Sequence, residues 1–187
     1  RTAAIRKYVS VDPKKIVVPH IFVDGSLLLG IRKRTLDFII ANHFLEHLRN
    51  PVASLVAWAA RLKIHGTLIL AVPDHDLIFD KLRTVTPISH LLYDFILTEA
   101  ESARSDENHM AAMLLAFRRE GYPEHQRSDD EIRKQARNLY QSNDGGVHYH
   151  TFTVSSLIEL LITVALFIPF KIKAVFDFPQ TSKTLRC

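Results

Sequence analysis

The chain has 187 residues, 47% hydrophobic and 24% charged, which excludes a disordered chain and suits one globular domain. Its net charge is +4, but the basic residues are scattered, so a nucleic-acid-binding stripe is not expected. The single cysteine, Cys187, excludes an internal disulfide and a cysteine-based zinc cluster, and it favours a cytoplasmic setting.

Three β-branched or apolar runs in the first quarter of the chain predict strands. Ala4 to Val9 and Lys15 to Val18 are short runs separated by a turn that contains Pro13. Leu36 to Ala41, "LDFIIA", is nearly continuous in apolar residues, which is typical of a parallel sheet covered on both faces. We therefore predict a central strand at Leu36 to Ala41.

A helix and another strand follow. Apolar residues from Val52 to Leu62 recur at helical spacing after Pro51, His65-Gly66 predicts the helix stop, and Thr67 to Val72 predicts a strand. Strand, helix and strand of these lengths form a βαβ unit, in which ligands bind at the carboxyl ends of the strands. The candidate site therefore lies in the two loops "NHFLEH" and "PDHD".

The middle and end of the chain predict mainly helix. Residues 87–143 are polar and helical, and we interpret them as an insertion or lid within a single domain, 1–187. A helix capped near Thr153 or Ser155 and a strand from Lys171 to Phe178 should follow. The apolar run from 155 to 170 is too short and too interrupted for a membrane span, so we expect a buried helix.

The spacing His43-x-x-Glu46-His47 also matches an inverted zinc-protease signature. Such a site needs both histidines on one helical face and a further ligand. Four downstream carboxylates are available: Glu99, Glu101, Glu120 and Glu124. Because His43 lies one or two residues past a buried strand, on a turn rather than inside a long helix, we expect no metal site here. A zinc-dependent hydrolase through His43, Glu46 and His47 is kept as an alternative.

Several motifs follow one another in an order that is typical of one protein family. They are the strand end Asp37-Phe38-Ile39-Ile40, a "LEH" turn, a proline-led helix, the corner Leu62-Lys63-Ile64-His65-Gly66 and a strand ending in Val72-Pro73. This order resembles the second half of class I S-adenosylmethionine-dependent methyltransferases. Residues 72–95 and the His148-Tyr149-His150 element resemble one subgroup of that family. The resemblance implies an α/β Rossmann-like three-layer sandwich and S-adenosylmethionine as cofactor.

The resemblance also assigns candidate roles. It implies that Asn42 and His43 lie near the methyl group of the cofactor, with Ser10 and His20 at the positions that hold its ribose and adenine. The substrate-binding candidates are Asp80, Arg83 and His90. The catalytic candidates are Asp74, His75, His148 and His150. The mixture of acids, histidines and arginine favours a polar acceptor, such as a sugar or a small acid.

One part of the family pattern is absent. The six glycines form no Gly-x-Gly-x-Gly loop, whose backbone would approach the cofactor closely. We therefore expect an N-terminally incomplete methyltransferase domain rather than a rearranged sheet. The alternative is a catalytically inactive remnant that binds a partner. His148 and His150 should alternate along a strand, so that only one faces the pocket.

Overall fold

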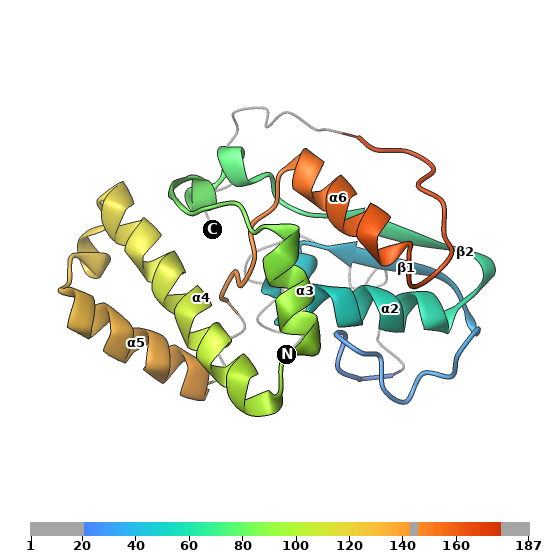
Figure 1. Ribbon diagram of the computed structural model, residues 1–187, viewed down its shortest axis with the longest axis horizontal. Helices are drawn as coiled ribbons and strands as arrows, with labels where there is room; N and C mark the ends of the chain where they lie inside the picture. The colour runs from blue at the N-terminus through green and yellow to red at the C-terminus, as the bar shows by residue number, and fades with distance from the viewer. Residues whose placement is uncertain (1–20, 143–145, 177–187) are drawn as a thin grey trace, which may run out of the picture.

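The computed structural model describes residues 21–142 and 146–176. Two predicted strands, at residues 4–9 and 15–18, and the candidates Ser10 and His20 lie outside these ranges. The elements in chain order are β1 (Leu36–Asn42), η2 (Leu45–His47), α2 (Pro51–Arg61), β2 (Leu62–Ala71), η3 (His75–Leu77), η4 (Phe79–Leu82), α3 (Ile88–Ile96), α4 (Glu99–Glu120), η5 (Pro123–His125), α5 (Asp129–Ser142) and α6 (Val154–Val164). In Figure 1, α4 and α5 lie at one end, the strands with α2 and α6 at the other, and α3 between them.

The two strands form a parallel pair joined by α2, so the predicted βαβ unit is confirmed. Asn50 caps α2 by accepting a hydrogen bond from the Ala53 N–H, and Pro51 occupies the first turn. The strand pairing is irregular before Phe38, where the partner residue jumps from Leu62 to Thr67. His65 lies in this irregular stretch with a left-handed φ of 69°. Helix α2 ends at Arg61, where the next residue, Leu62, is already extended. This is four residues before the predicted stop at His65.

One face of the sheet carries the main core. Ile39 and Leu68 pack with the buried residues of α2, α3 and α6, of which Trp58 is the largest. On the other face Phe38 and Ile40 are more than 60% exposed. The described residues thus include one covering layer of helices, and the three-layer sandwich stays a prediction.

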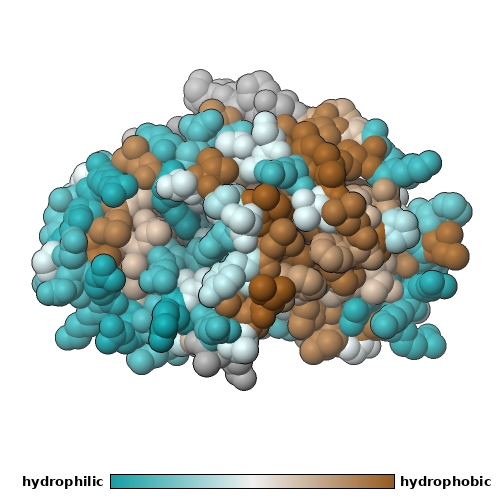
Figure 2. All heavy atoms as spheres, in the orientation of Figure 1, coloured by the Kyte–Doolittle hydropathy of each residue, from teal (hydrophilic) through white to brown (hydrophobic). Residues whose placement is uncertain are grey.

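A second core lies between α4 and α5. Met110 and Leu114 of α4 pack against Ile132 and Ala136 of α5, together with residues of the segment 146–153. A capping box between Thr98 and Glu101 begins α4. These helices occupy the range predicted as an insertion, and Figure 2 shows that their half of the molecule is mostly hydrophilic, whereas hydrophobic side chains gather over the other half.

The segment after α5 differs from the sequence prediction. Residues 147–153 form no strand apart from one isolated bridge between Phe152 and Asp74, so the short strand expected here is wrong. His148 and His150 nevertheless contact different residues, Asp80 and Asp94. Thr153 caps α6, as predicted. The strand predicted from Lys171 is wrong as far as Phe176, since residues 171–176 are irregular and pair with no described strand. Within the described ranges, no helix has the length and apolarity needed to cross a bilayer.

Candidate functional site

The carboxyl ends of β1 and β2 lie side by side and bring two predicted loops to one edge. Asn42 is the last residue of β1 and is exposed. The His43 N–H donates to the Ala71 carbonyl at 3.0 Å, and the left-handed backbone of His43 (φ 47°) leaves its side chain 62% exposed. Asp74 follows β2, and its carboxylate accepts a hydrogen bond from the Asp76 N–H. Asn42, His43 and Asp74 thus occupy the sheet edge at which the βαβ unit predicts a ligand site.

His75 lies beneath this edge. Its side chain is buried, Nδ1 lies 2.7 Å from an Asp76 carboxylate oxygen, and Nε2 lies 2.8 Å from the Arg83 carbonyl. Its backbone N–H donates to the Phe152 carbonyl at 2.7 Å. Since both ring nitrogens already have partners, His75 holds this loop in place and is not poised to act on a substrate.

Asp80, Arg83 and His148 form a buried network. The two Asp80 oxygens lie 2.7 Å from Arg83 Nη1 and 2.6 Å from His148 Nδ1. Arg83 also donates to the carbonyls of His148 and Tyr149. Burial acts to raise the pKa of Asp80, but the hydrogen bonds and charges of His148 and Arg83 outweigh it and lower the pKa. This network joins η4 to the segment 146–153, and it removes all three predicted site residues from the surface.

The buried carboxylate of Glu46 lies close to three histidines, His43, His47 and His148, and His43 Nδ1 is 3.6 Å from Glu46 Oε1. Glu46 is 1% exposed, and its oxygens accept no hydrogen bond from the described residues. His47 Nε2 lies 3.9 Å from Glu46 Oε1, while its Nδ1 contacts the Val147 carbonyl at 2.9 Å. Glu46, His47 and His148 are close enough to share an ion, and we call them the Glu46 group.

The geometry of residues 42–47 does not fit the interpretation of "NHFLEH" as a zinc-protease signature. Residues 45–47 are a single 3-10 turn, so His43 and His47 do not project from one face of an α-helix. His43 is not a member of the Glu46 group. Of the nominated extra ligands, Glu101 caps α4 and Glu120 pairs with Lys81 at 3.1 Å.

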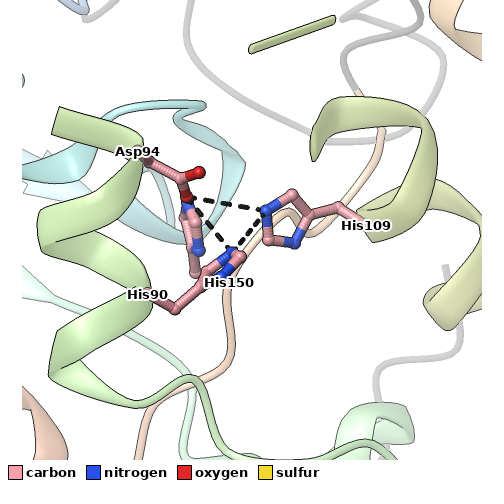
Figure 3. A group of neighbouring side chains, drawn as sticks. All are labelled: His90, Asp94, His109 and His150. Atoms are coloured by element: carbon pink, nitrogen blue, oxygen red, sulfur yellow. Dashed lines mark hydrogen bonds and ion pairs between the residues drawn. The ribbon is translucent and has the colours of Figure 1, made fainter. Parts of the chain in front are cut away.

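A second set of metal-ligand residues gathers where α3, α4 and the segment 146–153 meet, and Figure 3 shows their side chains pointing toward one another. We call it the histidine–aspartate cluster; its members are His90, Asp94, His109 and His150. The Nε2 atoms of His90 and His109 lie 3.0 Å apart. Asp94 Oδ2 lies 3.3 Å from His90 Nε2, 3.6 Å from His109 Nε2 and 3.8 Å from His150 Nε2.

Burial sets the electrostatics of this cluster. It lowers the pKa of His150 to about 3 and, together with the charge of His109, lowers the pKa of His90. Burial acts to raise the pKa of Asp94, but its polar contact with His109 and the charges of His90 and His150 lower it. At neutral pH the cluster therefore holds an ionised Asp94 carboxylate beside the neutral imidazoles of His90 and His150, the protonation states in which these groups ligate metals.

Sequence reasoning found only part of this arrangement. It selected His90 and His150 separately, but it assigned one to substrate binding and the other to catalysis. The spacing of His90 and Asp94, one helical turn apart, was a usable signal. His109 was missed, because the polar stretch around it carries no motif and its partners are distant in the sequence.

No family model, curated protein or solved structure matches the chain.

Proposed function

We propose that this chain is a methyltransferase-type domain that transfers a methyl group from S-adenosylmethionine to a polar small-molecule or sugar acceptor in the cytoplasm. The observation that supports this most is the parallel β1–α2–β2 unit, which brings Asn42, His43 and Asp74 to one sheet edge. In open α/β sheets, ligands bind at the carboxyl ends of the strands.

The proposed cofactor contacts are Asn42 and His43. Both are exposed at the end of β1, and the left-handed turn at His43 directs the chain away from the strand. Bound S-adenosylmethionine would supply an electrophilic methyl group. The protein would contribute positioning and exclusion of water, since methyl transfer needs an in-line approach of the acceptor.

The acceptor side of the proposed site is the loop after β2. Asp74 is partly exposed there, and it could accept a hydrogen bond from an acceptor hydroxyl. His75, Asp80, Arg83 and His148 are buried beneath it, so we assign them positioning roles.

Calorimetric titration of the full chain with S-adenosylhomocysteine tests cofactor binding. We expect saturable binding that Asn42→Ala weakens by about tenfold, the loss of roughly one hydrogen bond. His65→Gly, a change at an exposed position on the far side of the strand pair from this edge, serves as the matched control and should bind normally. Absence of binding to the unaltered chain would refute the proposal.

The second candidate is a non-catalytic module that keeps this half of the fold for binding a partner. The surroundings of Gly25 and Gly30 favour this second candidate. A Cβ at Gly25 would meet the Phe44 ring at 2.8 Å, so Gly25 serves packing, and Gly30 lies in a left-handed turn. Neither belongs to a cofactor loop. A folded chain that binds no S-adenosylhomocysteine would favour this candidate.

A further inference from the structure

We propose that the histidine–aspartate cluster binds a divalent transition-metal ion, with zinc as the ion that its ligands suit best. This inference does not rest on the proposed methyl transfer, because none of the four cluster residues is a proposed cofactor or acceptor contact. The cluster does touch the loop after β1, since the His150 N–H donates to the Glu46 carbonyl.

The distances between ligand atoms are those of a nearly assembled tetrahedral site. Metal–nitrogen bonds of about 2.0–2.1 Å give ligand atoms about 3.3 Å apart in a tetrahedron. The measured separations around Asp94 Oδ2 are 3.3, 3.6 and 3.8 Å, and the His90–His109 separation is 3.0 Å. These four separations lie within about 0.5 Å of the tetrahedral value, and all the ligand atoms lie within 4.8 Å of one another.

The cluster contains polar atoms that the described residues leave without hydrogen bonds. Asp94 Oδ2 and His150 Nδ1 are both buried and have no hydrogen-bond partner. The facing nitrogens of His90 and His109 can share only one proton between them. Buried polar groups normally find partners, so a buried carboxylate oxygen that faces three imidazole nitrogens without a hydrogen bond indicates that a cation belongs here.

The surrounding contacts orient the ligands as outer contacts do in metal sites. Ser105 Oγ donates to Asp94 Oδ1 at 2.9 Å, which leaves Oδ2 directed at the histidines. Asn50 Nδ2 donates to the backbone carbonyl of Asp94. His150 Nε2, the nitrogen that lies 3.8 Å from Asp94 Oδ2, also lies 3.3 Å from the Arg49 carbonyl, so His150 would exchange this long contact for the metal bond.

The composition of the site selects the ion and its role. Three imidazoles and one carboxylate, without a thiolate, suit zinc and related first-row ions and suit calcium or magnesium poorly. Four protein ligands leave no open position, which is typical of a structural zinc site. The ligands come from α3, α4 and the segment 146–153, so the ion would join the core beneath the sheet to the core between α4 and α5.

The test measures zinc binding by the full chain after treatment with a chelator. Equilibrium dialysis followed by elemental analysis should give one tightly bound ion per chain, and cobalt(II) should give the visible absorption of a tetrahedral site. Zinc should also raise the midpoint of thermal unfolding.

The variants locate the ion. Asp94→Asn keeps the size of the side chain but removes the charge, and it should weaken zinc binding by more than about 100-fold, since even outer-contact residues contribute about 10–100-fold. Ser105→Ala, which removes an outer contact, should weaken zinc binding by about 10–100-fold. Two matched controls, His65→Gly and Glu46→Gln, should bind zinc as the unaltered chain does.

Circular dichroism of the metal-free proteins shows whether each variant is folded. If Asp94→Asn does not fold, His90→Ala replaces it, because the His90 side chain is 35% exposed and its loss is easier to tolerate. Absence of stoichiometric zinc from the unaltered chain would overturn the proposal. Binding that survives Asp94→Asn or His90→Ala but is lost in Glu46→Gln would also overturn it and place the ion in the Glu46 group. If S-adenosylhomocysteine fails to bind while zinc binds, only the proposed function is refuted.

Discussion

At the scale of single residues, the buried charges of Asp80 and Arg83 share a partner that is remote in the sequence. Asp80 and Arg83 are one turn apart, but their common partner His148 is 68 residues from Asp80. Their residue types and their positions in the family pattern selected these three side chains as site candidates. They could not show that the residues face one another in the interior rather than a substrate, because that depends on the path of the segment 146–153.

Asp80→Asn should destabilise the chain strongly. It leaves the buried Arg83 guanidinium without its carboxylate, a change that typically costs about 3–5 kcal/mol in the free energy of unfolding. The control is Asp129→Asn, whose pair with Arg118 is exposed on the aspartate side and should be worth about 1 kcal/mol or less. Urea denaturation of both variants measures the difference, and equal losses would contradict the role of the network.

Asp80 also predicts a dependence on pH. Its pKa is lowered in the folded chain, so its contribution to stability is present above the unfolded pKa of about 3.9 and is lost as the pH falls through the folded value. The difference in unfolding free energy between the unaltered chain and Asp80→Asn should therefore shrink in acid below about pH 4. A difference in unfolding free energy that stays constant from pH 7 to pH 3 would contradict a stabilising role of the Asp80 carboxylate.

Glu46→Gln should stabilise the metal-free chain. Both Glu46 oxygens are buried without hydrogen bonds from the described residues, since the His43 and His47 nitrogens lie 3.6 and 3.9 Å from Oε1. A carboxylate costs more to bury than a neutral amide. We expect a gain of about 1 kcal/mol or more in urea denaturation. Glu107→Gln, at a half-exposed pair with Arg137, is the control and should change stability little. A loss of stability in Glu46→Gln would indicate that the carboxylate has a partner that stabilises it.

At the scale of elements, apolar runs and caps predicted β1, α2, β2 and the start of α6 from the sequence. These signals are local. The run "LDFIIA" is itself the strand β1, and Asn50-Pro51 and Thr153 lie at the first residues of the helices that they begin. The run from Lys171 carries the same strand-forming residues, but as far as Phe176 it has no described strand to pair with. A strand requires a partner, which propensity alone does not supply.

His65→Gly should stabilise the irregular first part of β2. His65 has a φ of 69°, a left-handed conformation that costs a residue with a Cβ about 1–2 kcal/mol relative to glycine. Glycine loses part of this gain through the greater freedom of the unfolded chain, so we expect a net gain below about 1 kcal/mol. Thermal unfolding at several scan rates measures it. A lower midpoint would show that the His65 side chain makes a stabilising contact.

At the scale of the whole molecule, the two hydrophobic cores meet at the segment 146–153. Val147 and Tyr149 pack with α4 and α5, whereas Phe152 packs with α2, α3 and α6. His150 lies between them in the sequence and belongs to the histidine–aspartate cluster. An ion in that cluster would therefore couple the unfolding of the two halves.

Hydrogen exchange should reveal this coupling. Without metal, amides of α4 and α5 should exchange faster than those of β1 and α2, because the helical pair has the smaller core. Zinc should slow exchange in α4 and α5 toward the rate of the other half. Zinc-independent exchange in both halves would contradict the coupling.

The most direct test of the proposed function is photochemical cross-linking of S-adenosylmethionine to the full chain, with the labelled peptides located by mass spectrometry. The sheet-edge site predicts label on residues 42–47 or 72–77, with competition by S-adenosylhomocysteine. Absence of label, or label confined to α4 and α5, would contradict a cofactor site at the carboxyl ends of β1 and β2.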